Sequence, residues 1–300
     1  MSAYIQLNCW LIFEASPAIL ENHSAMHQPS PQASWPTSWN SSYQMDLEEV
    51  FGIIRNRGYA YAYDVRREKT FDLLTRGIKP PAKVLDIAAA QGNFSLSLAE
   101  QGYCVTWNDL RDDLAGYVKL KHTTGDVAYA PGNAFDLNFE KLFDAVLITE
   151  VIEHVAHPDS FLAATARLVR PGGCIVMTTP NGAYFQNALP RFSDCADPSI
   201  YESEQFKPDG DGHIFLLYRD EINRFALASG LVVEELQFFT NLLTSGHMKT
   251  SLVLRILPRR LVETIEVGTQ LLPIKIAERL LLQVGVRFRK PLETENQVAA

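Results

Sequence analysis

Two short stretches of the chain carry side chains that can bind a metal ion or transfer a proton. Glu150, Glu153 and His154 follow an apolar run, and His213 lies in the stretch Gly-Asp-Gly-His-Ile-Phe. On one turn of helix the first three would share a face, which would bring two carboxylates and an imidazole together. Such a group either binds a divalent ion or lets His154 act as a general base, with Glu153 and His213 as further catalytic candidates. We favour proton transfer without a metal ion. A metal site formed by Glu150, Glu153, His154 and His213 is the less favoured alternative.

A second group of residues forms a corner suited to binding a nucleotide. The apolar run Val-Leu-Asp-Ile predicts a buried strand, which ends near Asp86 and is followed by residues with small side chains. Ala88, Ala90 and Gly92 let the backbone approach a ligand, and a turn tolerates both alanines if they keep a negative φ. Asn93 is a candidate N-cap for the next helix, whose N-terminal N–H groups would face the same ligand.

These residues must be positioned by an alternating series of strands and helices. Apolar runs predict strands at 103–107, 126–129 and 145–148, and a Pro-Gly-Gly turn begins another strand at 174–178. Helical patterns separate the strands, which indicates an open, doubly wound α/β sheet. Asp109 follows the second strand, where a carboxylate can accept hydrogen bonds from ribose hydroxyls or cap the helix that follows.

The corner resembles motif I of the class I, Rossmann-like methyltransferases that depend on S-adenosylmethionine. That motif reads Asp/Glu-x-Gly-x-Gly-x-Gly, and Asp86-Ile-Ala-Ala-Ala-Gln-Gly92 has alanine at two of the three glycine positions. Glu150-Val-Ile-Glu-His154 and the turn that starts at Arg170 are similar to the motif after the fourth strand and to motif III of this class. From the order of these motifs the chain is identified as a type 11/23-like member. The resemblance implies a seven-stranded doubly wound sheet of order 3-2-1-4-5-7-6, with the last strand antiparallel and helices on both faces.

The resemblance also implies S-adenosylmethionine as the cofactor. Asp109 would hold the ribose, and Asn133 takes the place of an aspartate that meets the adenine amino group in the family. The implied cofactor-binding residues are Asp86, Ala88, Ala90, Gly92, Asn93, Asp109, Leu110, Asn133, Ala134 and Glu150. The Glu-x-x-Glu-His element is similar to one found in two subgroups. In small-RNA 2′-O-methyltransferases it helps to hold a divalent ion, and a similar set occurs in quinone-precursor O-methyltransferases.

Composition narrows the class of methyl acceptor. A formal net charge of -8 and a pI near 5.4 argue against a protein that grips nucleic acid through its phosphates. The four cysteines form no Cys-x-x-Cys pair, which favours a reducing, cytoplasmic setting. We expect methylation of a small-molecule or lipid-linked acceptor, on oxygen rather than nitrogen. The alternatives are a cofactor-binding domain without chemistry, a metal-dependent enzyme like the small-RNA methyltransferases and, more remotely, an NAD-dependent oxidoreductase.

The two ends of the chain differ from its middle. Residues 1–45 are rich in Pro, Ser, Gln and Asn and are expected to be a disordered tail, and residues 292–300 a second tail. The methyltransferase domain would span 46–291, with helices at 46–80 that could cover the cofactor. A helical insertion is expected at 241–279, where apolar and basic residues alternate. It could cap the site, form a homodimer or make peripheral contact with an anionic membrane.

Overall fold

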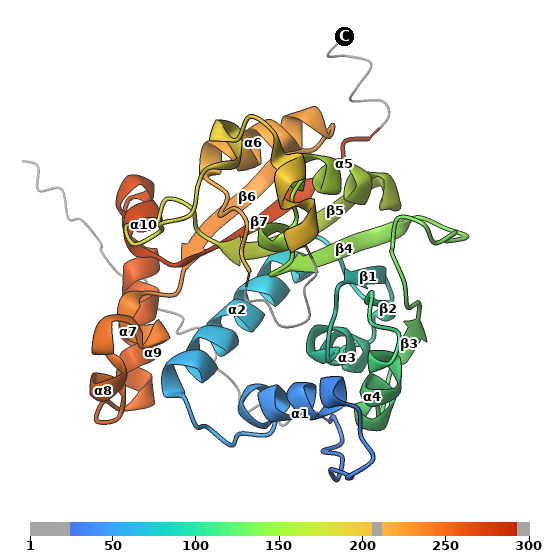
Figure 1. Cartoon of the computed structure of the whole chain (residues 1–300), viewed down its shortest axis with the longest axis horizontal. Helices are drawn as coiled ribbons and strands as arrows, with labels where there is room; N and C mark the ends of the chain where they lie inside the picture. The colour runs from blue at the N-terminus through green and yellow to red at the C-terminus, as the bar shows by residue number, and fades with distance from the viewer. Residues whose placement is uncertain (1–24, 206–211, 293–300) are drawn as a thin grey trace, which may run out of the picture.

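The computed structural model describes residues 25–205 and 212–292, and its centre is one seven-stranded sheet (Figure 1). The strand order is β3-β2-β1-β4-β5-β7-β6, and only β7 runs antiparallel to its neighbours. The predicted sheet is therefore confirmed. The strands are β1 Lys83–Ile87, β2 Cys104–Asn108, β3 Asp126–Tyr129, β4 Phe143–Thr149, β5 Val169–Pro180, β6 Val232–Phe239 and β7 Gln283–Arg289.

Helices cover both faces of the sheet. Helices α2, α3 and α4 lie on one face, and α5 and α6 lie on the other (Figure 1). The helices are α1 Thr37–Glu49, α2 Arg57–Thr75, α3 Asn93–Glu100, α4 Leu114–Lys121, α5 Pro158–Leu168, α6 Arg219–Ala228, α7 Leu242–Ser245, α8 Ser251–Leu254, α9 Arg259–Gln270 and α10 Ile274–Leu280. Single 3-10 turns occur at Ile152–His154, Phe192–Asp194, Pro198–Glu204 and His247–Lys249.

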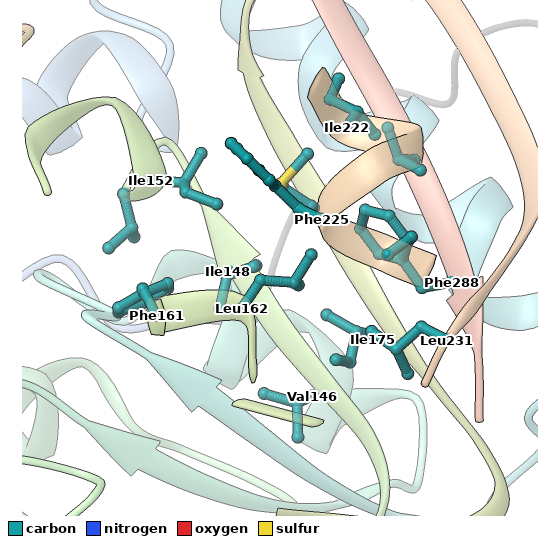
Figure 2. Close-up of a cluster of buried hydrophobic side chains, with 14 of the residues drawn as sticks. Val146, Ile148, Ile152, Phe161, Leu162, Ile175, Ile222, Phe225, Leu231 and Phe288 are labelled. Carbon is teal, nitrogen blue, oxygen red and sulfur yellow. The ribbon is translucent and has the colours of Figure 1, made fainter. Parts of the chain in front are cut away.

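The largest core cluster fills the space between the central strands and the α5–α6 pair. Figure 2 shows Val146 and Ile148 of β4 beside Leu162 of α5, with Ile222 and Phe225 of α6 on the same side. All five side chains are almost fully buried. Burying each aliphatic or aromatic side chain contributes about 1.5–3 kcal/mol, so this cluster fixes the position of the sheet against its helices.

Strand register brings the predicted site residues to one edge of the sheet. Ile87, at the end of β1, lies level with Asn108 of β2 and with Ile148 of β4. Thr149 of β4 lies level with Thr178 of β5. Because these strands are parallel, their carboxyl ends open at the same edge, and the loops that follow them meet there.

The N-terminal region is more ordered than its composition predicts. We expected a tail as far as residue 45, but helix α1 begins at Thr37, and residues 1–24 lie outside the described part. The physical reason is an aromatic cluster: Trp35 packs edge-on against Trp39, Tyr43 and Tyr117, with ring centroids 5.8–5.9 Å apart. Trp39 and Tyr43 are four residues apart on α1 and share one face, and Trp35, just before the helix, packs between them and Tyr117 of α4.

The region between β6 and β7 contains four short helices, α7 to α10, grouped along one flank of the molecule (Figure 1). It is longer than the insertion predicted at 241–279, because α10 continues to Leu280 and the last strand starts only at Gln283. Helix α7 packs on α2, and α9 and α10 pack against β6. Within the described residues, no helix combines the length and the apolar character needed to cross a membrane.

Candidate functional site

The corner after β1 has a left-handed backbone at three positions. Ala88, Ala90 and Gly92 have φ values of 54°, 47° and 73°. Neither alanine therefore meets the condition of a negative φ, and each costs roughly 1–2 kcal/mol of steric strain because of its Cβ. At Gly92 a Cβ would lie 2.7 Å from Val118 Cγ1, so this glycine is required by packing as well as by its backbone angle.

Hydrogen bonds from β2 and the residue after it hold the strained corner in place. Ala89 N–H donates to the Asn108 carbonyl at 2.8 Å, and Ala90 N–H donates to Asp109 Oδ2 at 2.9 Å. The Trp107 indole N–H donates to the Ala90 carbonyl at 3.1 Å. Both backbone groups of Ala90, its N–H and its carbonyl, are therefore hydrogen-bonded. These bonds hold the loop in its strained conformation although two of the family's glycines are replaced by alanine.

Asp86 lies beneath this loop, and its side chain is almost completely buried. Ser95 Oγ donates to Asp86 Oδ2 at 2.6 Å, whereas Oδ1 is buried without a partner. Burial raises the pKa of Asp86 to about 7; the Ser95 hydrogen bond opposes this rise and the Asp109 carboxylate adds to it. Asp86 thus stabilises the corner, because its hydrogen bond with Ser95 joins β1 to α3.

Asn93 does not have the predicted N-cap role. The N-cap of α3 is Gly92, and Asn93 is the first helical residue, with a buried side chain. Its amide nitrogen donates to Asp46 and Glu49 of α1 at 2.8 Å, and its oxygen accepts from Lys121 at 2.6 Å. These contacts join α1 to α3 and α4, and the cofactor role of Asn93 stays a prediction.

Asp109 is buried at the end of β2, as a ribose-binding carboxylate requires. Its Oδ1 accepts from the Arg111 backbone N–H at 2.9 Å and from Arg111 Nε at 3.0 Å. Helix α4 begins only at Leu114, with Asp113 as its N-cap, so Asp109 does not cap it. The Arg111 side chain is about half exposed and can move away when a ligand needs the carboxylate.

An apolar cavity of about 320 Å³ opens beside this corner. Four residues predicted to bind the cofactor line it: Ala88, Leu110, Asn133 and Ala134. The other lining residues, which sequence reasoning missed, are Ile87, Asn108, Gly132, Phe135, Val151, Val155, His157, Ser160, Phe161 and Ala164. The spacing of four between Val151 and Val155 was the available signal. A cavity of this size with few polar groups suits a flat, weakly polar ring.

Asn133 meets the cavity, but its side chain is already engaged. Its amide nitrogen donates to Asp136 Oδ2 at 2.8 Å, and its oxygen accepts from the Phe135 backbone N–H at 3.2 Å. The oxygen retains a second lone pair, which can still accept from a ligand amino group.

Glu150 departs from the predicted helical face. It has a φ of 54°, and its backbone N–H donates to Thr178 O at 2.8 Å, so the chain turns immediately after β4. Its carboxylate pairs with Arg66 at 3.1 Å and accepts from Gln283 at 3.2 Å. Glu150 is therefore absent from the group of potential metal ligands. Sequence reasoning missed Arg66, although its spacing of three from Tyr63 and four from Thr70 places it on the buried stripe of α2.

Glu153, His154 and His213 do come together. One potential ligand atom from each lies within 4.8 Å of the others, and the two imidazole centroids are 4.9 Å apart. Ile214 N–H donates to the Glu153 carbonyl at 2.7 Å, which brings the chain around His213 onto the loop after β4. Thr179 Oγ1 donates to Glu153 Oε2 at 2.9 Å. Burial raises the pKa of Glu153, and the Glu150 carboxylate raises it further.

A family model described as a methyltransferase domain matches residues 56–236, more than half of the chain. Together with the strand order, this match decides the family. The chain belongs to the class I S-adenosylmethionine-dependent methyltransferases. A solved methyltransferase of this cofactor class from Mesorhizobium loti has a TM-score of 0.50 at 14% identity, covering 74% of this chain and 96% of that one. At this identity it shows the shared fold alone.

Curated relatives of this methyltransferase carry a more specific name. The ubiquinone biosynthesis O-methyltransferase of Xanthomonas oryzae is 33% identical over 160 residues, covering 52% of this chain and 63% of the relative. The enzyme of the same name from Aromatoleum aromaticum is 38% identical over 103 residues, which are 33% of this chain and 44% of that enzyme. The chain thus spans less than two thirds of the length of these relatives.

The residues of this methyltransferase fit S-adenosylmethionine, its cofactor. Several buried polar atoms at the carboxyl edge have no hydrogen-bond partner, among them Arg66 Nε, Glu150 Oε1, Glu153 Oε1 and Thr178 Oγ1. Since buried polar groups are nearly always paired, these unpaired atoms indicate a place for a polar ligand. Glu150 directly precedes Val151, which lines the apolar cavity. In α2, Tyr59 donates to Glu49, and Tyr63 packs edge-on against Phe94 at 6.1 Å.

Proposed function

We propose that this methyltransferase transfers a methyl group to a phenolic oxygen of a hydroxylated aromatic acceptor of the quinone-precursor type. The observation that carries the proposal is the pair His154 and His213 beside the buried Glu153. Val151 and Val155, which flank Glu153 and His154 in the chain, line the cavity. A phenol must lose its proton to become a good nucleophile, and an imidazole is suited to accept it near neutral pH. The name of the curated relatives supports the same acceptor class.

On the cofactor side, the protein's task is to hold and orient. We propose that the Asp109 carboxylate binds the ribose hydroxyls, while Leu110, Asn133 and Ala134 enclose the adenine ring in the apolar cavity. When bound, S-adenosylmethionine supplies a methyl group already activated as a sulfonium. Alignment of the reacting atoms and exclusion of water are then the main contributions of the chain.

Arg66 completes the polar end of the same space. Its guanidinium is mostly buried on α2 and pairs with Glu150, and its buried Nε has no partner. A buried cation with a free N–H favours an anionic group, so we propose that Arg66 receives the carboxylate of the methionine moiety. Glu150 holds the guanidinium in position from the other side.

On the acceptor side, His154 is the proposed base, and Glu153 and His213 orient it. The His154 Nδ1 lies 3.3 Å from the Gly212 carbonyl, which favours a proton on Nδ1 and leaves Nε2 to accept one. The same three donors could bind a divalent ion instead. Two observations disfavour it: Glu150 is occupied by Arg66, and the raised pKa of Glu153 favours its neutral form, a poor metal ligand.

The acceptor is further proposed to carry an apolar chain. The segment after β5 places Phe185 on the surface with about half of its side chain exposed, directly against α10.

The helical insertion leads to two proposals about partners. It makes peripheral contact with a membrane, or it forms a homodimer. A cytoplasmic location stays a prediction.

The experiment is a methylation assay with labelled S-adenosylmethionine and three acceptors: a prenylated catechol, the same molecule with both oxygens already methylated, and a short single-stranded RNA. We expect label only in the free catechol. Label in the RNA would overturn the acceptor class. Binding of S-adenosylhomocysteine without turnover of any acceptor would favour the cofactor-binding alternative.

A further inference from the structure

We propose that the surface of helices α8 to α10 lies on an anionic lipid bilayer. Its apolar side chains point to solvent, and Ile256 and Leu271 are 84% and 77% exposed. The other members of this membrane face are Leu252, Val253, Leu261, Val267, Ile274 and Ile276, all at least 44% exposed. Amphipathic helices that expose such residues beside basic ones insert shallowly at the boundary between lipid headgroups and acyl chains.

Charge identifies the kind of surface that this face meets. Residues 240–282 contain six Lys and Arg against three Glu, within a chain whose formal net charge is -8. The three glutamates are all engaged: Glu263 pairs with Arg259, Glu278 pairs with Arg219, and Glu266 accepts backbone N–H groups. Lys249, Arg255, Arg260, Lys275 and Arg279 are exposed. The face is therefore positive on an otherwise acidic protein.

A second copy of the chain fits this face less well than a bilayer. A symmetric dimer would bring two copies of the same positively charged surface together, and like charges across an interface are destabilising. An anionic bilayer offers the opposite charge and attracts each basic residue near its surface. It also accepts side chains such as Ile256 without needing a matching pocket.

The membrane face adjoins the acceptor side of the site. Asn181 Nδ2 donates to the carbonyls of Glu278 and Leu281 at 2.7 Å, and Phe185 N–H donates to the Arg279 carbonyl at 3.1 Å. Helix α10 is thus fixed to the segment after β5, close to Glu150 through Gln283. Resting on the proposed function, this position lets an apolar acceptor pass from the bilayer to the site without crossing water.

The test is co-sedimentation of the full chain with phosphatidylcholine vesicles, with and without phosphatidylglycerol, at low and high salt. We expect binding only to the anionic vesicles, weakened at high salt because ions screen the surface charge. Lys275→Gln with Arg279→Gln should lower binding on the order of tenfold. Ile256→Asp with Leu271→Asp should lower it as well. Leu227→Asp is the matched control, since Leu227 is 80% exposed on α6, outside the face.

Failure of this proposal is distinguishable from failure of the proposed function, because no acceptor is present in the binding assay. Absence of binding to anionic vesicles at low salt would overturn the membrane face. So would equal binding by the Ile256→Asp, Leu271→Asp protein and the Leu227→Asp control. Sedimentation velocity tests the competing case, in which the face binds a second copy of the chain. A wild-type dimer that Ile256→Asp with Leu271→Asp dissociates would overturn the membrane proposal in favour of that dimer. All variants should still bind S-adenosylhomocysteine, which verifies that they are folded.

Discussion

The backbone N–H of Ala90 donates a 2.9 Å hydrogen bond to Asp109 Oδ2, which ties the loop after β1 to the carboxylate that follows β2. The contact joins a strained residue, with a φ of 47°, to a residue that we expect to bind the ribose. Loop geometry and cofactor affinity are therefore linked through one carboxylate.

The strain at Ala90 predicts an unusual response to glycine. Ala90→Gly removes a Cβ from a left-handed position, and this relief of about 1 kcal/mol offsets the entropy lost by ordering glycine. We expect stability unchanged or slightly increased. Ala163→Gly, inside α5, is the control and should destabilise by about 1 kcal/mol. Urea unfolding measures both. A loss at Ala90 as large as at Ala163 would contradict the strain.

The buried Asp86 predicts a stability that falls as pH rises. Its pKa is 3.8 in its ordinary state and about 7 in the fold, so between these values the folded protein holds a proton that the unfolded chain lacks. The contribution of Asp86 to the free energy of unfolding is thus largest below pH 4 and is lost as pH rises through 7. From pH 5 to pH 8 the wild type should lose roughly 2–3 kcal/mol more than Asp86→Asn. Parallel losses in the two proteins would show that Asp86 is not protonated in the fold.

The ion pair between Asp46 and Lys121 anchors α1. Both side chains are fully buried, 2.7 Å apart. Lys121→Met leaves the Asp46 carboxylate without its cation, which should destabilise by about 3–5 kcal/mol, and adding Asp46→Asn should recover part of the loss. The control is Arg55→Met, which removes the partially exposed pair with Glu48 on the same helix and should cost under about 1 kcal/mol. Equal effects at Lys121 and Arg55 in urea unfolding would refute the anchoring role.

The imidazole cluster predicts catalysis that is indifferent to chelators. His154→Gln should lower kcat with the prenylated catechol by roughly 10²- to 10⁴-fold and leave the affinity for S-adenosylhomocysteine unchanged. His122→Gln, a histidine after α4, is the control. EDTA should not change the wild-type rate. A rate lost with EDTA and restored by a divalent ion would replace the base with a metal centre built on Glu153, His154 and His213.

Local patterns predicted most of the strands because they are short apolar runs separated by clear turns. The third strand agrees with the prediction, and Asp86 and Asp109 lie near the carboxyl end of β1 and just after β2. The sheet order, which agrees as well, came from the family resemblance. Contacts between distant segments were harder to foresee. The backbone reversal at Glu150 depends on its bond to Thr178, and the placement of Asn93 depends on α1, whose polar composition concealed its aromatic stripe.

Calorimetric titration with S-adenosylhomocysteine tests the central claim, that this corner binds the cofactor through Asp109. We predict saturable binding by the wild type, no binding of NAD, and a loss of about 10- to 100-fold for Asp109→Asn, since a hydrogen bond to a charged group contributes about 1.5–3 kcal/mol. Arg111→Met, which removes the guanidinium that occupies the same carboxylate, should retain or increase the affinity. Absence of binding by the wild type, or an Asp109→Asn protein that binds as tightly, would contradict the account.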